Sequence, residues 1–151
     1  MPTNNQDLSP ITLSVVSGTL ENTIREMSEI IIQTARSVVI AIGRDFSTTL
    51  LGHLDGIPIM VAQGDDQPIH LGDLILKVKE GARYFGVTEE SGELGPGDVI
   101  FQNDPESGGN HLPDISMYKP IFVAGELVAW AAVTCHIPEV GGPVPGAFNP
   151  D

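Results

Sequence analysis

The segment from Asn103 to Asp114, NDPESGGNHLPD, gathers residues that could bind a metal ion. His111 and Asp114 lie three positions apart in it, a spacing that can bring both side chains to the same side of a turn. An imidazole nitrogen and a carboxylate oxygen together suit a divalent ion such as Zn, Mn or Fe(II). Gly108 and Gly109 allow the backbone to turn tightly just before this pair.

A third ligand is available at His136, at the far end of a β-hairpin that we expect after this segment. The return strand of the hairpin would bring His136 beside the loop that precedes the first strand. Two histidines and one carboxylate leave coordination positions open, as is typical of a catalytic metal site. The spacing alone also leaves open a plainer interpretation, because an isolated His-x-x-Asp pair is more often a turn with a local hydrogen bond.

Four further residues could support or surround such a site. Asp104 and Glu139 could orient the ligands, because a metal-bound histidine usually donates its second N–H to an oxygen, but both could equally be exposed loop acids. His70 precedes an expected helix, and we interpret it as a residue that caps or orients that helix. Cys135 points to the opposite face of its strand from the neighbouring histidine, so we expect it to be packed rather than reactive.

Composition and missing motifs exclude several function classes. Seven Lys and Arg against 20 Asp and Glu give a formal charge of -13, which would repel nucleic acid. The chain has no GxGxxG or Walker-type lysine loop for ATP and no GxSxG elbow for a serine hydrolase. A single cysteine, a polar start and no apolar run long enough for a membrane span favour a cytoplasmic protein without a membrane partner.

The elements that must position these residues can be predicted from their patterns. Ser9 followed by Pro10 is typical of a helix start, and apolar residues then recur at helical spacing at Leu13, Val16, Leu20, Ile24, Met27, Ile31, Ala35 and Val38. Shorter runs predict strands at Phe46 to Leu51, Ile57 to Ala62, Asp98 to Gln102, Ile115 to Val123 and Leu127 to His136, and a helix at Asp73 to Tyr84.

Short turns between most of these strands favour an antiparallel arrangement. We therefore predict an α+β fold with a long N-terminal amphipathic helix, a second shorter helix, and a mostly antiparallel sheet that ends in a C-terminal hairpin. Residues 1–151 would form a single domain. The Gly- and Pro-rich ending, GGPVPGAFNPD, shows no packing pattern, which suggests a fragment or a split subunit.

The run GPGDVIFQNDPESGGNHLPDISMYKPIF, from Gly95 to Phe122, resembles the signature of the hydantoinase B/oxoprolinase family. In that signature a Gly-Asp strand leads to NDP, a GG-x-H-L-P-D core and an outgoing strand. The segment from His136 to Gly142 is similar to the family's later His motif. The resemblance implies that His111, Asp114 and His136 are metal ligands.

The resemblance also implies an activity and a partner. Family members open cyclic amides such as hydantoins and 5-oxoproline at the expense of ATP, which a hydantoinase A-type subunit uses. Their subunits are several times longer than this chain, so we expect the N-terminal metal-site portion, inactive alone and assembled with the remainder of a B-type subunit in a hetero-oligomer. Two alternatives remain: a subunit of an ATP-dependent acetone or acetophenone carboxylase, and a non-catalytic assembly module docked through its long helix.

Overall fold

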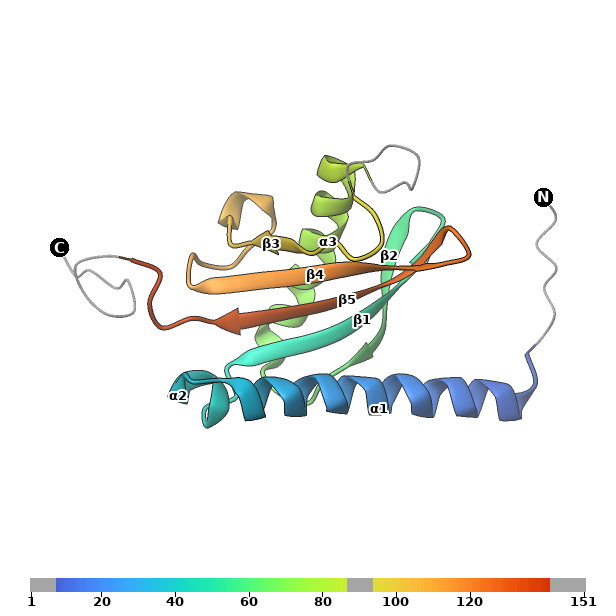
Figure 1. Ribbon diagram of the computed structural model, residues 1–151, viewed down its shortest axis with the longest axis horizontal. Coiled ribbons are helices and arrows are strands. Elements are labelled where there is room, and N and C mark those ends of the chain that lie inside the picture. The colour runs from blue at the N-terminus through green and yellow to red at the C-terminus, as the bar shows by residue number, and fades with distance from the viewer. Residues whose placement is uncertain (1–7, 87–93, 142–151) are drawn as a thin grey trace.

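The structure is a computed structural model that describes residues 8–86 and 94–141 (Figure 1). Its centre is a five-stranded sheet in the order β2-β1-β5-β4-β3, in which every neighbouring pair of strands is antiparallel. The strands are β1 (Phe46–Leu54), β2 (Ile57–Gln63), β3 (Ile100–Gln102), β4 (Asp114–Val123) and β5 (Glu126–His136). This confirms the predicted α+β class and the hairpin, which consists of β4 and β5.

Helix α1 (Pro10–Thr34) begins where the sequence predicts, because the side chain of Ser9 accepts a hydrogen bond from the Thr12 N–H. The helix ends earlier than its apolar spacing suggests. The backbone is extended at Ala35, and a separate short helix, α2 (Val38–Ala41), follows. After this break, Ile40 packs in one buried cluster with Phe46 at the start of β1 and Cys135 near the end of β5.

The second predicted helix is α3 (Leu71–Phe85), preceded by the 3-10 turn η1 (Pro68–His70). A second 3-10 turn, η2 (Pro105–Ser107), lies in the segment between β3 and β4. Strand β3 begins two residues later than predicted because Asp98 closes a turn with Gly95: each backbone N–H of this pair donates to an oxygen of the other residue. His53 lies in β1.

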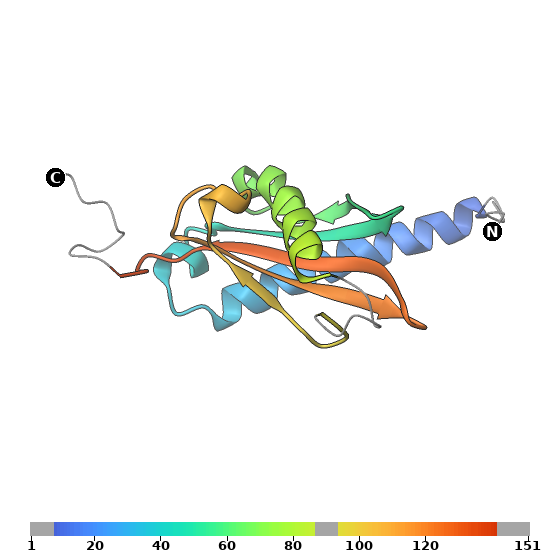
Figure 2. The same ribbon diagram turned by 90° about the horizontal axis from the view of Figure 1, so that it is seen from above.

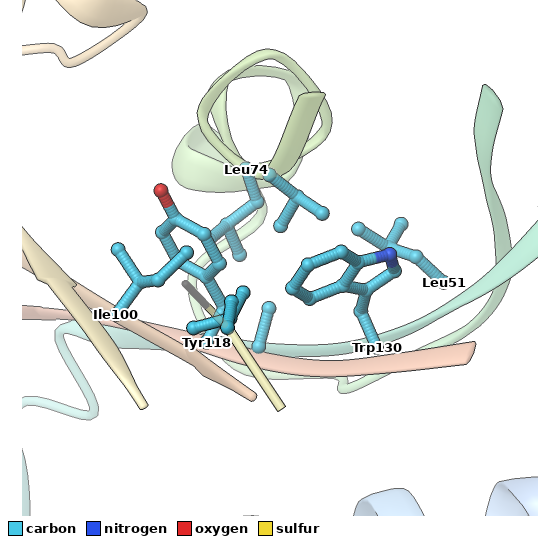
Figure 3. Packing of buried hydrophobic residues seen from close by; sticks show 8 residues of the cluster. Leu51, Leu74, Ile100, Tyr118 and Trp130 are labelled. Carbon is cyan, nitrogen blue, oxygen red and sulfur yellow. The ribbon is translucent and has the colours of Figure 1, made fainter. Parts of the chain in front are cut away.

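The sheet separates two helical layers, with α1 and α2 on one face and α3 on the other (Figures 1 and 2). The larger buried cluster lies between α3 and the sheet (Figure 3) and consists of Leu51, Leu74, Val78, Leu94, Ile100, Tyr118, Trp130 and Ala132. A smaller cluster on the α1 face contains Ile40, Phe46 and Cys135. None of the helices in the described ranges is both long and apolar enough to span a bilayer.

The face of the sheet under α3 changes from polar to apolar along the strands. Residues opposite each other in an antiparallel register share a face. Matched pairs therefore form rows: Asp114 with His136, Ser116 with Thr134, and Tyr118 with Ala132. The first row is ionisable, the second carries hydroxyls, and the third belongs to the apolar core. Residues 87–93, before β3, and all but the first residue of the Gly- and Pro-rich ending lie outside the described residues.

Candidate metal centre

Two of the three predicted ligands meet at one end of the hairpin. Asp114 is the first residue of β4 and pairs in register with His136, the last residue of β5. The backbone N–H of His136 also donates to the carbonyl of Asp45 at 3.0 Å, which continues the pairing of β5 with the chain entering β1. The expectation that the return strand carries His136 to the loop before β4 is thus confirmed.

The third predicted ligand, His111, is brought in by a tight turn. The backbone N–H of Asp114 donates to the His111 carbonyl at 2.9 Å, so the two side chains leave the same side of the turn. The loop before it requires glycine. Gly108 has φ +91°, and a Cβ at Gly109 would lie 2.6 Å from the Asp104 carbonyl oxygen. The sequence prediction for Gly108 and Gly109 is therefore confirmed.

The carboxylate of Asp114 lies between the two imidazoles. Its Oδ1 is 3.1 Å from Nδ1 of His136, and its Oδ2 is 3.2 Å from Nδ1 of His111. The imidazole rings are nearly perpendicular, with centroids 5.1 Å apart. Asp114 is only 1% exposed, whereas the His111 side chain is 43% exposed. The cluster therefore has a buried carboxylate on its inner side and an exposed imidazole on its outer side.

These residues form a donor set that could hold a divalent metal ion. One ligand atom from each residue can be chosen so that all lie within 4.8 Å of one another. Two ligands on a tetrahedral ion with bonds of about 2.0–2.1 Å lie roughly 3.3 Å apart, close to the 3.1 and 3.2 Å that separate the Asp114 oxygens from the two imidazole nitrogens. Two buried atoms, Nδ1 of His111 and Oδ2 of Asp114, have no hydrogen-bond partner in the described part of the chain. A cation between them would satisfy both.

A buried polar layer lies directly next to the cluster, in the hydroxyl row of the sheet. Nζ of Lys77 donates to Oγ of Ser116 at 2.7 Å, and Ser116 is 2.6 Å from Oγ1 of Thr134. Lys77 is completely buried, and its ammonium lies 3.3 Å from the Asp73 carboxylate one helical turn earlier. This layer separates the ionisable row from the apolar core, and its lysine was not predicted from the sequence.

The two acids proposed to orient the ligands accept hydrogen bonds within their own loops. The side chain of Asp104 accepts from the Ser107 hydroxyl and from the Glu106 N–H, and these bonds hold its pKa below the usual value. Glu139 accepts from the Gly141 N–H at 2.7 Å. Their role in orienting a metal ligand stays a prediction.

The positions of two residues near the cluster, His70 and Asp45, were not predicted from the sequence. His70, interpreted as a helix-capping residue, makes no side-chain cap bond and lies buried beside Asp114. Asp45 lies on the other side of His70. No local pattern marks these residues, because their proximity depends on β1 lying next to β5 and on η1 folding over the sheet.

Cys135 behaves as predicted. It faces the smaller apolar cluster with Phe46 and Ile40, away from the ligand face. Burial, with a smaller contribution from the negative charge of Asp45, raises the pKa of its thiol to about 11. The thiol therefore stays protonated at neutral pH and is a poor nucleophile.

Comparison with known proteins places this chain in a family. Residues 9–151 match the model of hydantoinase B/oxoprolinase. The beta subunit of caprolactamase from Pseudomonas jessenii is 46% identical over 95% of this chain, which corresponds to 23% of that subunit. A 5-oxoprolinase from Dictyostelium discoideum is 35% identical over 95% of this chain and 11% of the enzyme. This chain thus spans a quarter or less of these relatives.

Two solved structures share the fold. The crystal structure of ATP-dependent caprolactamase from Pseudomonas jessenii superposes with a TM-score of 0.83 at 46% identity, over 96% of this chain and 24% of the matched chain. The nucleotide-free structure of acetone carboxylase has a TM-score of 0.78 at 23% identity, over 91% of this chain and 17% of the matched chain, and at this identity it supports the fold alone. The chain belongs to the hydantoinase B/oxoprolinase family.

Proposed function

We propose that this chain is the metal-site portion of an ATP-dependent hydrolase that opens cyclic amides. His111, Asp114 and His136 would hold one divalent ion, of zinc, manganese or iron. The observation that carries the proposal is the convergence of their three ligand atoms at the end of the β4–β5 hairpin, inside the segment that the family model matches. Two nitrogens and one oxygen suit any of these ions and leave positions free for substrate.

The residues of this chain would bind and orient the metal, and the metal would act as a Lewis acid. A divalent ion held here would polarise a substrate carbonyl or activate water. The buried carboxylate of Asp114 would provide the negative charge that retains the cation. His111 lies on the exposed side, so a substrate would approach past this residue.

ATP would be used elsewhere in the assembly. The chain contains no phosphate-binding loop, and its formal charge of -13 disfavours a nucleotide. The similar caprolactamase from Pseudomonas jessenii has a beta subunit and is described as ATP-dependent. We therefore infer a hydantoinase A-type partner that uses ATP, together with the remainder of a B-type subunit.

Cyclic-amide hydrolysis is favoured over ketone carboxylation by the degree of similarity. The caprolactamase subunit shares 46% of aligned residues with this chain, whereas acetone carboxylase shares 23%. Caprolactam and 5-oxoproline are both lactams, so the names of the two curated relatives point to the same bond type.

The substrate class can be tested by ADP release from the chain assembled with its ATP-using partner. We expect ADP release to depend on a cyclic amide such as caprolactam, 5-oxoproline or hydantoin, and to fall to background in His136→Ala. A His53→Ala variant is the matched control, because His53 lies in β1 near the opposite end of the sheet. ADP release that requires acetone and bicarbonate would instead identify a carboxylase. A tight complex without turnover of either substrate would identify an assembly module.

A further inference from the structure

His70 occupies a buried position between two carboxylates. It ends the turn η1 immediately before α3 and is only 2% exposed. Its Nδ1 lies 3.6 Å from Oδ2 of Asp114, and its Nε2 lies 3.7 Å from Oδ1 of Asp45. The imidazole therefore connects a predicted metal ligand at the start of β4 with an acid at the entrance to β1.

Neither nitrogen of His70 has a hydrogen-bond partner among the described residues. Leaving both nitrogens of a buried imidazole unpaired costs free energy, so such a residue usually has a role beyond packing. Oδ2 of Asp114 is an acceptor close to Nδ1, and this oxygen is itself without a hydrogen-bond partner among the described residues. A shift of a few tenths of an ångström would bring the two atoms to hydrogen-bonding distance.

The second oxygen of Asp114 is already occupied. Oδ1 makes a hydrogen bond with Nδ1 of His136, so that side of the carboxylate is held by β5. Oδ2 faces both His111 and His70. A carboxylate oxygen has two lone pairs, and it can therefore accept an N–H from one residue while it binds a cation.

We propose that His70 is a positioning residue for the metal site and acts through Asp114. Its Nδ1–H donates to Oδ2 and fixes the carboxylate in the orientation that faces His111. His70 is not itself a ligand, because the atoms that lie close enough to share one ion come from His111, Asp114 and His136 among the described residues. This inference rests on the proposed metal site.

The proposed hydrogen bond connects the metal site with the helix α3, which packs on one face of the sheet. The three ligands lie on the β4–β5 hairpin and the turn before it, whereas His70 belongs to the segment that starts α3. Metal ligands are commonly oriented by hydrogen bonds to neighbouring groups, and loss of such a group typically weakens metal binding about 10- to 100-fold. A weakening of this size is expected when the His70 donor is removed.

Two variants that preserve bulk separate the hydrogen bond from packing. His70→Leu fills the space without a donor, and His70→Gln keeps an N–H donor; His53→Ala serves as control. The affinity for Zn²⁺ would be measured by competition with a chromophoric chelator. We expect about a 10- to 100-fold weaker affinity for His70→Leu, substantial recovery for His70→Gln, and no change for His53→Ala. Circular dichroism and thermal unfolding would show which variants are folded.

X-ray absorption spectroscopy of the Zn²⁺-loaded proteins distinguishes positioning from ligation. The number of imidazole ligands should be the same in wild type and in His70→Gln. Loss of one imidazole in that variant would make His70 a ligand and overturn the proposal. Equal Zn²⁺ affinity in wild type and in folded His70→Leu would also overturn the proposal. That result would leave the proposed metal site itself intact. A wild-type protein that binds no Zn²⁺, Mn²⁺ or Fe²⁺ would instead refute the proposed site.

Discussion

Gly81 sets the distance at which α3 lies over the sheet, and we predict that Gly81→Ala destabilises the fold. A Cβ at this position would lie 2.1 Å from Oη of Tyr118 and 2.8 Å from two carbons of its ring. Ordinary van der Waals contact begins near 3.4 Å, so either the helix or the tyrosine must move. The same helix carries Lys77 and follows His70, so the distance between α3 and the sheet also affects the candidate site.

The tyrosine has little room to move. Tyr118 is 1% exposed, its ring lies edge-on to Trp130, and its hydroxyl donates to Oε1 of Gln102 at 2.6 Å. Overpacking a core of this kind costs about 1–3 kcal/mol, and a distorted hydrogen bond adds roughly 0.5–1.5 kcal/mol. The better helix propensity of alanine stabilises α3 by only about 1 kcal/mol relative to glycine. The free energy of unfolding should therefore fall by about 0.5–3.5 kcal/mol.

Urea unfolding followed by far-UV circular dichroism would measure this change. Gly18→Ala is the matched control, because Gly18 lies within α1 with nothing within 4 Å of its added Cβ, and this variant should gain about 0.5–1 kcal/mol. The Tyr118→Phe background removes the closest clashing atom, so the penalty of Gly81→Ala should shrink there. A Gly81→Ala protein as stable as wild type, or a penalty unchanged in that background, would refute the packing argument.

Further predictions concern the buried lysine and the cysteine. Lys77→Ala should lower the free energy of unfolding by about 2–4 kcal/mol, because it empties a buried volume and removes the donor to Ser116. The control Lys79→Ala, on the exposed side of α3, should change the free energy of unfolding by less than about 0.5 kcal/mol. Urea titration measures both changes. Cys135 should react with a disulfide reagent at pH 8 only on unfolding, and stability should fall as pH rises from 9.0 to about 11, since the unfolded thiol loses its proton first. Rapid modification of the folded protein, or the same pH slope in Cys135→Ala, would count against the buried thiol.

The local parts of the fold and site could be predicted because their signals are local. Ser9 and Pro10 mark the start of α1, and the Ala124–Gly125 turn between two apolar runs marks the β4–β5 hairpin. Once the hairpin is predicted, His136 must return to the start of β4. The sequence therefore predicted the meeting of Asp114 and His136 from turn chemistry and strand alternation alone.

The rest depends on contacts between distant segments. Strand order is decided by packing, so nothing near Asp45 shows that β1 lies beside β5. The burial of His70 requires η1 to fold over that same end of the sheet. Lys77 is charged and adjoins the apolar stripe of α3, and lysines are almost never fully buried unless they are paired. The hydroxyl of Ser116 and the carboxylate of Asp73 provide that pairing only in the folded chain.

In the function that we propose, His111, Asp114 and His136 hold a divalent metal. The most direct test is elemental analysis of protein purified without chelators, compared with Asp114→Asn, which preserves side-chain volume but removes the charge between the imidazoles. We expect close to a single zinc, manganese or iron ion per wild-type chain and almost none in the folded variant. Equal metal content in the two proteins, or a wild-type protein that stays metal-free when supplied with all three ions, would contradict it.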